Sequence, residues 1–437
     1  MAKIGVAISG GGHRAALFGL GALLYLVDSD RSRDVASIAS VSGGSLTNGF
    51  VAQSVDYRSV EAGEFRTAMR PLARRLATKG TLLPPSPLTL AYLALLLLVF
   101  LAAIIGVWFL PWKVGYRVLA FVVGLLLLGV VANLRGLVAS RAFARTLFSP
   151  KGRPTQLASI TTAVDHAICA ADLHAGENVY FSGAFVCSYR LGWGTPGDLP
   201  LHVAVQASAA LPGAFPPRWL RTSRHGFVDG RPEAADATRM ALVDGGVYDN
   251  MADQWGLGIV GRKRRWPEHA ADLHQPEQLV IVNASAGLEW EPIWKLRVPL
   301  VGEILALLKD KSVLYDNGNA VRRELAVERF RAGRLEGALV HIPQSPLRVA
   351  DAYASGSDDI SARARAVIEL LGPDRSEWEA IARANPSVTT GLSPLGAPVA
   401  ARLVRHAYAL TMANLHVLMN LPLLQVPSAE SFEDLMR

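Results

Sequence analysis

The chain has 437 residues, 51% of them hydrophobic, and a formal net charge of +7 with an isoelectric point near 9.5. This length is enough for one large domain or two smaller ones, and two cysteines are too few for a disulfide framework. The basic balance suits nucleic acid or an anionic membrane surface, and we expect no nucleic-acid partner. A mean hydropathy of +0.25 is high for a soluble protein.

A short apolar run, Ile4–Ile8, is followed by Gly10, Gly11 and Gly12 and then by a helix-compatible apolar stretch. We expect no signal peptide here, because the glycines interrupt the apolar stretch. The loop satisfies the G-x-G-x-x-A pattern of dinucleotide-binding loops, but no Gly-Lys-Ser/Thr closes it as in a P-loop. By itself, it can hold a dinucleotide, a phosphate or the oxyanion of a reacting ester.

A second apolar run, Val35–Val41, ends in the sequence S-V-S-G-G, ahead of another helix-compatible segment. This is the strand–turn–helix setting of a nucleophile elbow, G-x-S-x-G, with Ser40 in the place of the first glycine. Small neighbours, including Gly43 and Gly44, let the backbone turn sharply. Ser42 would then present its hydroxyl at a helix N-terminus, where the dipole favours developing negative charge. A helix N-cap is the other interpretation of Ser42.

The excess of apolar residues lies in two neighbouring segments. Leu88–Leu110 and Val118–Leu134 carry no charge, and each is long enough, or nearly so, to cross a hydrocarbon core of about 30 Å as a helix. Between them, Pro111–Arg117 contains Trp112 and Tyr116, aromatic residues typical of a membrane interface. We therefore predict a transmembrane helical hairpin with helices at about 88–110 and 116–134. A pair of buried core helices is the alternative.

Basic residues flank the predicted hairpin on both sides, whereas its turn carries only Lys113 and Arg117. The flanking residues are Arg66, Arg70, Arg74, Arg75 and Lys79 upstream and Arg135, Arg141 and Arg145 downstream. The positive-inside rule then places both ends of the hairpin, and the rest of the chain, in the cytoplasm. In a bacterium the membrane would be the inner one.

Beyond the hairpin, short apolar runs alternate with helix-compatible segments. The expected strands are His166–Ala170, Val179–Cys187, Met240–Val243 and Leu279–Val282, and the expected helices are Val321–Arg334 and Pro398–Leu424. Together with the first two runs, they predict an α/β fold whose mostly parallel sheet carries helices on both faces. The hairpin then interrupts one globular domain instead of linking two.

The expected strand Met240–Val243 ends at Asp244, and Gly245 and Gly246 let the chain turn away. An acid at the end of a strand is well placed to act as a base. A turn aspartate ahead of two glycines is a common alternative, so this stretch alone does not establish a site.

Together, the G-G-G-x-R loop at Gly10–Arg14, the elbow at Ser42 and the D-G-G at Asp244–Gly246 resemble the patatin-like phospholipases. The segments Ala171–Ser182 and Ala204–Pro217 are also similar to that family, and the resemblance covers about residues 1–56 and 155–285. It implies a patatin-like three-layer α/β fold interrupted by the hairpin. The expected parts are a first catalytic part (1–80), the hairpin (81–136), a second catalytic part (137–290) and a helical extension packed on them (291–437).

In the family that the sequence resembles, a Ser–Asp dyad works without histidine. The resemblance implies that Ser42 is the nucleophile, that Asp244 is the base, and that the N–H groups of Gly10–Gly12 form the oxyanion hole. Arg14 would steady that loop or bind a lipid phosphate, a surface salt bridge being the alternative. The substrate would be a membrane phospholipid or lysophospholipid in a bilayer. Neither a metal nor another cofactor is expected, and the sequence does not predict an oligomeric state.

Other functions stay open at this stage. A Ser–His–Asp lipase or esterase would use His13 or one of five later histidines, and Asp229 is a second candidate for the base. The later histidines are His269, His274, His341, His406 and His416. An acyltransferase would form the same acyl-enzyme. From other classes, a non-catalytic membrane scaffold and a dinucleotide-binding oxidoreductase remain alternatives.

Overall fold

The computed structural model describes residues 3–81, 87–109, 113–150, 152–287 and 301–437. Within these residues, ten strands form one mixed sheet in the order β10-β9-β1-β2-β3-β4-β5-β6, with β8 paired to β3 and β7 paired to β8. The strands are β1 Ile4–Ile8, β2 Val35–Val41, β3 Asp165–Asp172, β4 Glu177–Phe181, β5 Val186–Ser188, β6 Gly192–Gly194, β7 Arg218–Arg221, β8 Arg239–Asp244, β9 Gln278–Asn283 and β10 Glu336–His341.

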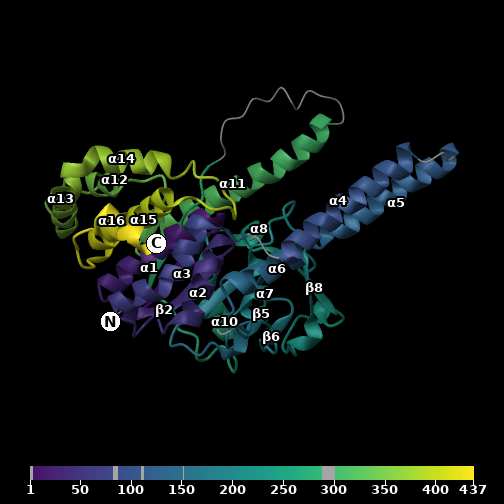
Figure 1. Ribbon diagram of the computed structural model, residues 1–437. Helices are drawn as coiled ribbons and strands as arrows, with labels where there is room; N and C mark the ends of the chain where they lie inside the picture. Colours follow the sequence, from purple (N-terminus) through teal and green to yellow (C-terminus); the bar gives the residue numbers. More distant parts are fainter. Residues whose placement is uncertain (1–2, 82–86, 110–112, 151, 288–300) are drawn as a thin grey trace.

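The part of the sheet from β10 to β3 is parallel, and the rest is antiparallel. The predicted α/β architecture is therefore confirmed, and its sheet is mixed. The helices are α1 Gly12–Asp28, α2 Gly43–Ser54, α3 Ala62–Thr78, α4 Pro87–Trp108, α5 Val114–Asn133, α6 Arg135–Thr146, α7 Leu201–Ser208, α8 Gly246–Asp249, α9 Asp253–Leu257, α10 Ile259–Arg265, α11 Val301–Arg331, α12 Pro346–Asp351, α13 Asp359–Leu371, α14 Arg375–Ala384, α15 Ala397–Met419 and α16 Ala429–Leu435 (Figure 1).

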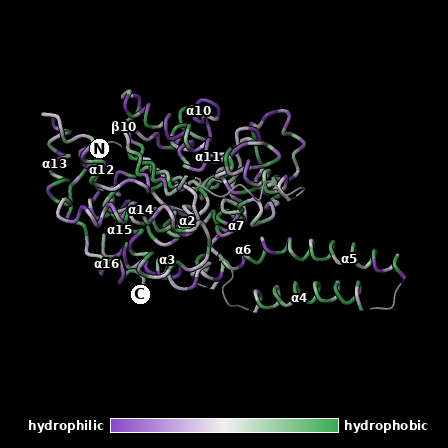
Figure 2. The backbone as a smooth tube through the Cα atoms, turned by 90° about the horizontal axis from the view of Figure 1, so that it is seen from above, coloured by the Kyte–Doolittle hydropathy of each residue, from purple (hydrophilic) through white to green (hydrophobic). Residues whose placement is uncertain are grey.

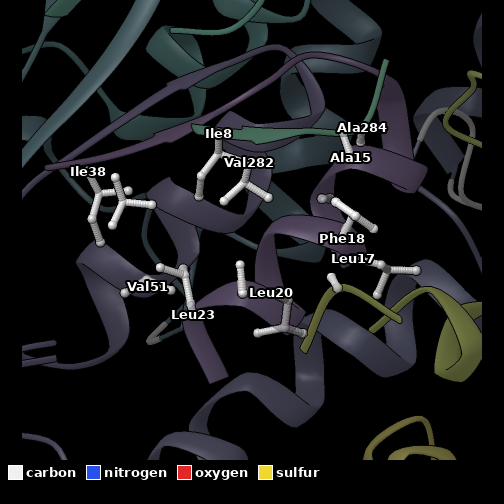
Figure 3. Packing of buried hydrophobic residues seen from close by; sticks show 14 of the residues in the cluster. Ile8, Ala15, Leu17, Phe18, Leu20, Leu23, Ile38, Val51, Val282 and Ala284 are labelled. Carbon is white, nitrogen blue, oxygen red and sulfur yellow. The ribbon is translucent and has the colours of Figure 1, made fainter. Parts of the chain in front are cut away.

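The central strands β1, β2 and β9 are buried along their whole length because both faces of the sheet are covered. On β1, Val6 and Ile8 belong to one buried cluster, whereas Ala7 between them belongs to another on the opposite face. The first cluster includes Phe18 and Leu20 of α1, which pack under β1 and β9 (Figure 3). Helices on the two faces thus hold rigid the strand ends from which the candidate site is built.

The predicted hairpin is present as α4 and α5, which project from the body as an antiparallel pair of apolar helices (Figures 1 and 2). In each, 11% of the most apolar 18-residue window is buried, so the alternative of two buried core helices is wrong. Both have the length and composition of membrane-spanning helices. Gly124 of α5 lets the two pack closely, since a Cβ there would lie 2.6 Å from that of Ala103. Trp112 lies outside the described residues.

The C-terminal third contributes both helices and a strand. Strand β10 pairs with β9 in parallel register and extends the sheet, and the long helix α15 packs along α1. This strand was not expected within residues 291–437. The reason is that its apolar run, Ala338–Val340, is too short to show a hydrophobic period.

Two further differences concern short strands. The predicted strand Val179–Cys187 is two strands, β4 and β5, joined by a tight turn in which the Ser182 N–H donates to the Phe185 carbonyl at 2.9 Å. Strands β6 and β7 were not expected, because segments of three and four residues are too short to show a hydrophobic period.

The contact between α1 and α15 is testable at Gly21. A Cβ there would lie 2.2 Å from the Val404 carbonyl oxygen, so α15 has no room for it. We expect Gly21→Ala to lower the free energy of unfolding by about 1–3 kcal/mol through overpacking. Gly63→Ala on α3, where no heavy atom lies within 4 Å of the added Cβ, is the matched control. Equal denaturation midpoints for the two variants would contradict this account of the packing.

Candidate active site

Ser42 lies in a strained turn between β2 and α2. Its φ of 52° and ψ of −118° place a non-glycine residue in a region that L-amino acids rarely adopt. Such a conformation costs on the order of 1–3 kcal/mol and persists only where neighbouring contacts impose it. The sequence prediction of a sharp strand–turn–helix elbow at this serine is therefore matched by the backbone geometry.

Hydrogen bonds from Ser208, the last residue of α7, hold this elbow. The Ser42 N–H donates to the Ser208 hydroxyl at 3.0 Å, and that hydroxyl donates to the Cys169 carbonyl of β3 at 2.6 Å. The Ser208 carbonyl in turn accepts from the Gly245 N–H at 3.2 Å. One residue thus ties the turn of Ser42 to the turn that follows Asp244. Sequence reasoning missed Ser208, although it lies in the segment 204–217 noted for its resemblance.

The serine that replaces the first glycine of the elbow motif is accommodated by a buried polar network. The Ser40 hydroxyl lies 3.0 Å from the Ser45 hydroxyl and accepts from the Asn48 side-chain amide at 2.9 Å. Ser45, the nearest alternative nucleophile, is fully buried and also bonds Ser208 at 2.9 Å. Ser40, Ser45 and Ser208 are buried, whereas Ser42 is partly exposed.

The glycine loop packs directly against the elbow. A Cβ on Gly43 would lie 1.9 Å from the Gly12 carbonyl oxygen, and one on Gly10 would lie 3.2 Å from the Ser42 Cβ. Gly11 and Gly12 have φ of 136° and 60°, which glycine adopts readily. A side chain on Gly43 would therefore push the elbow away from the glycine loop, whereas one on Gly12 would collide with Gly391, 2.4 Å from its carbonyl oxygen.

The amides of the loop are not equivalent. The Gly10 N–H donates to the Asn250 carbonyl at 3.0 Å, and the His13 N–H donates to the Gly391 carbonyl at 2.9 Å. Within the described residues, the N–H groups of Gly11 and Gly12, at the N-terminus of α1, have no backbone acceptor. Of the three glycines predicted for an oxyanion hole, these two are thus available as donors. The Gly391 carbonyl also occupies the helix N-terminus at which a pyrophosphate would bind.

Asp244 ends β8, opposite Ala170 of β3, and is 5% exposed. Its Oδ1 accepts the Gly246 N–H at 2.8 Å, which fixes one carboxylate oxygen. Gly245 is required by close packing, since a Cβ there would lie 2.3 Å from the Cys169 carbonyl oxygen. The D-G-G sequence therefore serves the turn and also places a buried carboxylate at the strand end.

One cavity of about 700 Å³ brings the three sequence motifs together. Its lining includes Gly10, Gly11, Gly12, Arg14, Ser42 and Asp244. Asp244 lies more than 200 residues along the chain from the other five. The volume falls within the roughly 300–1,000 Å³ typical of small-molecule sites. Segments that sequence reasoning did not connect with the site also line it, from α4, from α11 and from residues 390–392.

The histidines considered for a Ser–His–Asp triad do not line this cavity. His13 is buried between Thr81 and the Ser393 carbonyl, and burial lowers its pKa to about 4. The later ones bond elsewhere: His269 to Asp229, His274 to Asp165, His341 to the Ser285 carbonyl, His406 to Asn385 and the Gln344 carbonyl, and His416 to the Leu421 carbonyl. Asp229, the second candidate for the base, is also outside the cavity and has a 63% exposed side chain.

Arg14 is 5% exposed, and its guanidinium donates to the Pro386 and Val388 carbonyls at 2.8 and 2.6 Å. The alternative of a surface salt bridge is therefore wrong. These bonds hold residues 386–391 against the glycine loop, where the Gly391 carbonyl meets α1. Burial lowers the pKa of this guanidinium, and the electrostatic influence of Tyr315 offsets that in part.

Two residues near Asp244, Tyr315 and Asn250, were missed by sequence reasoning. A Cβ built on Gly246 would lie 3.0 Å from Asp244 Oδ1, 3.2 Å from the Tyr315 hydroxyl and 2.9 Å from Asn250 Oδ1, so the three groups surround one point. Tyr315 is 37% exposed, yet its hydroxyl end is buried here, and burial together with the Asp244 charge raises its pKa. No local pattern distinguishes this tyrosine within the long helix α11.

A buried ion cluster fixes α11 over the site. Arg322 contacts Asp249 at 3.1 Å and also pairs with Asp253, and both acids follow closely after Asp244. Burial and the like charge of Asp253 raise the pKa of Asp249, and the guanidinium partly compensates. Within the described residues, no group of three or more His, Cys, Asp and Glu side chains is arranged to hold a metal ion.

Comparison with known proteins identifies the family. A family model described as patatin-like phospholipase matches residues 6–252, which is more than half of the chain. The chain belongs to the patatin-like phospholipase family. This confirms the resemblance drawn from the glycine loop, the elbow and the D-G-G sequence, and the matched range includes all three. No curated protein matches this patatin-like chain.

Solved structures with a similar fold include human GIVD cytosolic phospholipase A2, at 15% identity over 65% of this chain and 43% of that chain, with a TM-score of 0.38. Its complex with methyl gamma-linolenyl fluorophosphonate and terbium chloride matches at 17% identity over 43% and 24%, with a TM-score of 0.27. VipD from Legionella pneumophila matches at 13% identity over 100% and 90%, with a TM-score of 0.25. The chain thus spans less than half the length of the human enzyme.

The role of Ser42 can be tested with an organophosphonate. We expect Ser42→Ala to abolish covalent labelling by a fluorophosphonate and hydrolysis of a soluble ester, because the strained turn presents this hydroxyl to the cavity. Mass spectrometry of the labelled wild type should place the adduct on Ser42. Labelling of Ser42→Ala at the wild-type level would move the assignment to another serine.

The role of Asp244 is tested by a pair of amide substitutions. Asp244→Asn keeps the shape but cannot accept a proton, so we expect ester hydrolysis to fall on the order of 10³-fold or more. Asp229→Asn, at the exposed Asp-Gly outside the cavity, is the matched control and should leave kcat/KM close to wild type. A reversed order of the two effects would refute the assignment.

Proposed function

We propose that this protein is a membrane-anchored serine acyl-ester hydrolase of the phospholipase A or lysophospholipase type. Family membership supports lipid acyl hydrolysis in general terms. The single observation that carries the finer proposal is the cavity in which the elbow serine, the buried Asp244 carboxylate and the glycine loop meet. Each of these groups matches one requirement of acyl transfer: a nucleophile, a base and donors for an oxyanion.

In the proposed reaction, Asp244 takes the proton of the Ser42 hydroxyl as the serine oxygen attacks the ester carbonyl. The resulting oxyanion receives hydrogen bonds from the Gly11 and Gly12 N–H groups at the N-terminus of α1. Collapse breaks the bond to the leaving alcohol oxygen, which takes the proton back from Asp244. Water then attacks the acyl-serine with Asp244 again as base, releasing the fatty acid and restoring Ser42.

In this proposal Arg14 acts as a positioning residue. Its two bonds to the carbonyls of Pro386 and Val388 hold the segment that covers the start of α1. That segment keeps the glycine loop in its positive-φ conformation and so keeps the Gly11 and Gly12 amides aimed at the elbow. The guanidinium lines the same cavity, so direct contact with a substrate phosphate is compatible with this role.

The competing functions are less well supported by the geometry. A triad would need a histidine beside Ser42, and none of the six histidines considered for that role lines the cavity that contains Ser42. Dinucleotide binding would need a free helix N-terminus at the glycine loop, and the Gly391 carbonyl stands there. A non-catalytic scaffold would have no use for a strained Ser42 beside a buried carboxylate. Transfer of the acyl group to an alcohol other than water uses the same acyl-enzyme and is distinguished by the product.

The direct experiment is to incubate the purified full chain with a dispersed phospholipid and with the corresponding lysophospholipid. Release of free fatty acid by the wild type, and its absence with Ser42→Ala, would support hydrolysis. Formation of a new ester in the presence of an added alcohol would identify an acyltransferase instead. Neither product from any lipid, together with no fluorophosphonate adduct, would leave the scaffold as the function.

The proposal also includes membrane anchoring by α4 and α5 with the catalytic part on the cytoplasmic side. Two uncharged helices satisfy their backbone hydrogen bonds internally in lipid, and basic flanks resist translocation. An anchored enzyme stays at its substrate at high effective concentration, and the net positive charge adds attraction to anionic headgroups.

This topology predicts the reactivity of a cysteine in the turn of the hairpin. Gly115 is the second residue of α5, and no heavy atom lies within 4 Å of a Cβ added there. The native Cys169 and Cys187 are buried, so they should contribute little background labelling. We expect Gly115→Cys to react with a membrane-impermeant thiol reagent in intact cells. Glu64→Cys on the basic flank should react only after the membrane is opened. Equal labelling of the two in intact cells would contradict the topology.

A further inference from the structure

The first hairpin helix forms part of the cavity that contains Ser42. Tyr92, Leu93 and Leu96 of α4 line this cavity. With the buried Thr89, they follow the spacing i, i+3, i+4, i+7, so they share one face of the helix. Thr89 is buried and Tyr92 and Leu96 are half-buried, Leu93 at the edge of this face is 45% exposed, and Leu98 on the opposite face is 64% exposed.

The rest of the cavity has both polar and apolar lining. The glycine loop, Ser42 and Asp244 are its reactive groups. Leu211, Ala214 and Phe215, from the segment after α7, provide further apolar lining, and the Arg135 guanidinium, which also lines the cavity, donates to the Ala214 carbonyl at 2.7 Å. An apolar chamber that leads to an ester-cleaving group suits a hydrocarbon chain, because each methylene removed from water contributes to binding.

The position of this lining along α4 sets the direction of access. Tyr92 to Leu96 lie in the half of α4 next to the catalytic part, and the opposite face of the same turns carries Leu95 and Leu98, which are 39% and 64% exposed. One helix therefore carries both the cavity wall and the lipid-type surface. An acyl chain lying along the hairpin in the adjacent leaflet reaches the chamber without crossing water.

We propose that α4 is the acyl-chain wall of the active site and that Leu93 and Leu96 determine chain-length specificity. The inference rests on the proposed function, since it assumes that Ser42 cleaves acyl esters. It gives the hairpin a second role beyond anchoring. The substrate class is a long-chain acyl lipid of the leaflet that faces the catalytic part, with its chain held between α4 and the segment 211–215.

The test compares matched tryptophan substitutions in the full chain purified in detergent, with butyrate and palmitate esters as substrates. Leu96→Trp fills the chamber, so we expect the palmitate-to-butyrate ratio of kcat/KM to fall about tenfold or more, as when an apolar pocket loses room for a few methylenes. Leu98→Trp adds the same side chain on the opposite, outer face and should leave that ratio at the wild-type value.

A second pair, Leu93→Trp with Leu95→Trp on the opposite face as its control, gives the same comparison if Leu96→Trp does not fold. Wild-type ratios in both inward variants would overturn the proposal, and so would equal changes in the inward and outward variants. A wild type that cleaves neither ester would overturn the proposed function instead. That outcome is recognised before any variant is compared.

Discussion

The candidate site depends on one hydrogen bond, from the Ser42 N–H to the Ser208 hydroxyl. A backbone with φ of 52° at a non-glycine residue is unfavourable by itself. It is held because Ser208 is in turn bonded to the Cys169 carbonyl of β3 and receives the Gly245 N–H on its own carbonyl. The strain at Ser42 is thus opposed by the sheet, and Ser208 links the elbow to the turn that follows Asp244.

The mixed sheet makes this arrangement possible. Parallel β1 and β2 place the glycine loop and the elbow at the same edge, since the carboxyl ends of parallel strands coincide. Antiparallel β8 then brings Asp244 opposite Ala170 of β3, next to that edge. Helix α11, fixed through Arg322 to Asp249 and Asp253, lays Tyr315 against the same carboxylate. The polar groups of the site are therefore positioned by the parallel strands β1 and β2 and by the antiparallel strand β8.

The hairpin links the chemistry to the environment of the substrate. Its apolar surface is large and exposed, and its first turns also line the cavity of Ser42. A helix that only anchored the protein would not need a face fitted to the active site. Under the proposed function, the site would lie at the boundary between the catalytic part and a bilayer.

The sequence by itself determined the elements whose signal is local. The apolar runs of β1 and β2 and the uncharged segments of the hairpin were predicted closely, because burial on two faces or in lipid demands continuous apolar residues. The candidate residues Ser42 and Asp244 were proposed from short local motifs that follow apolar runs. Only the tertiary structure decided which distant groups join them. Ser208, Tyr315 and Leu96 carry no local pattern, since their roles arise from packing between segments far apart in the chain.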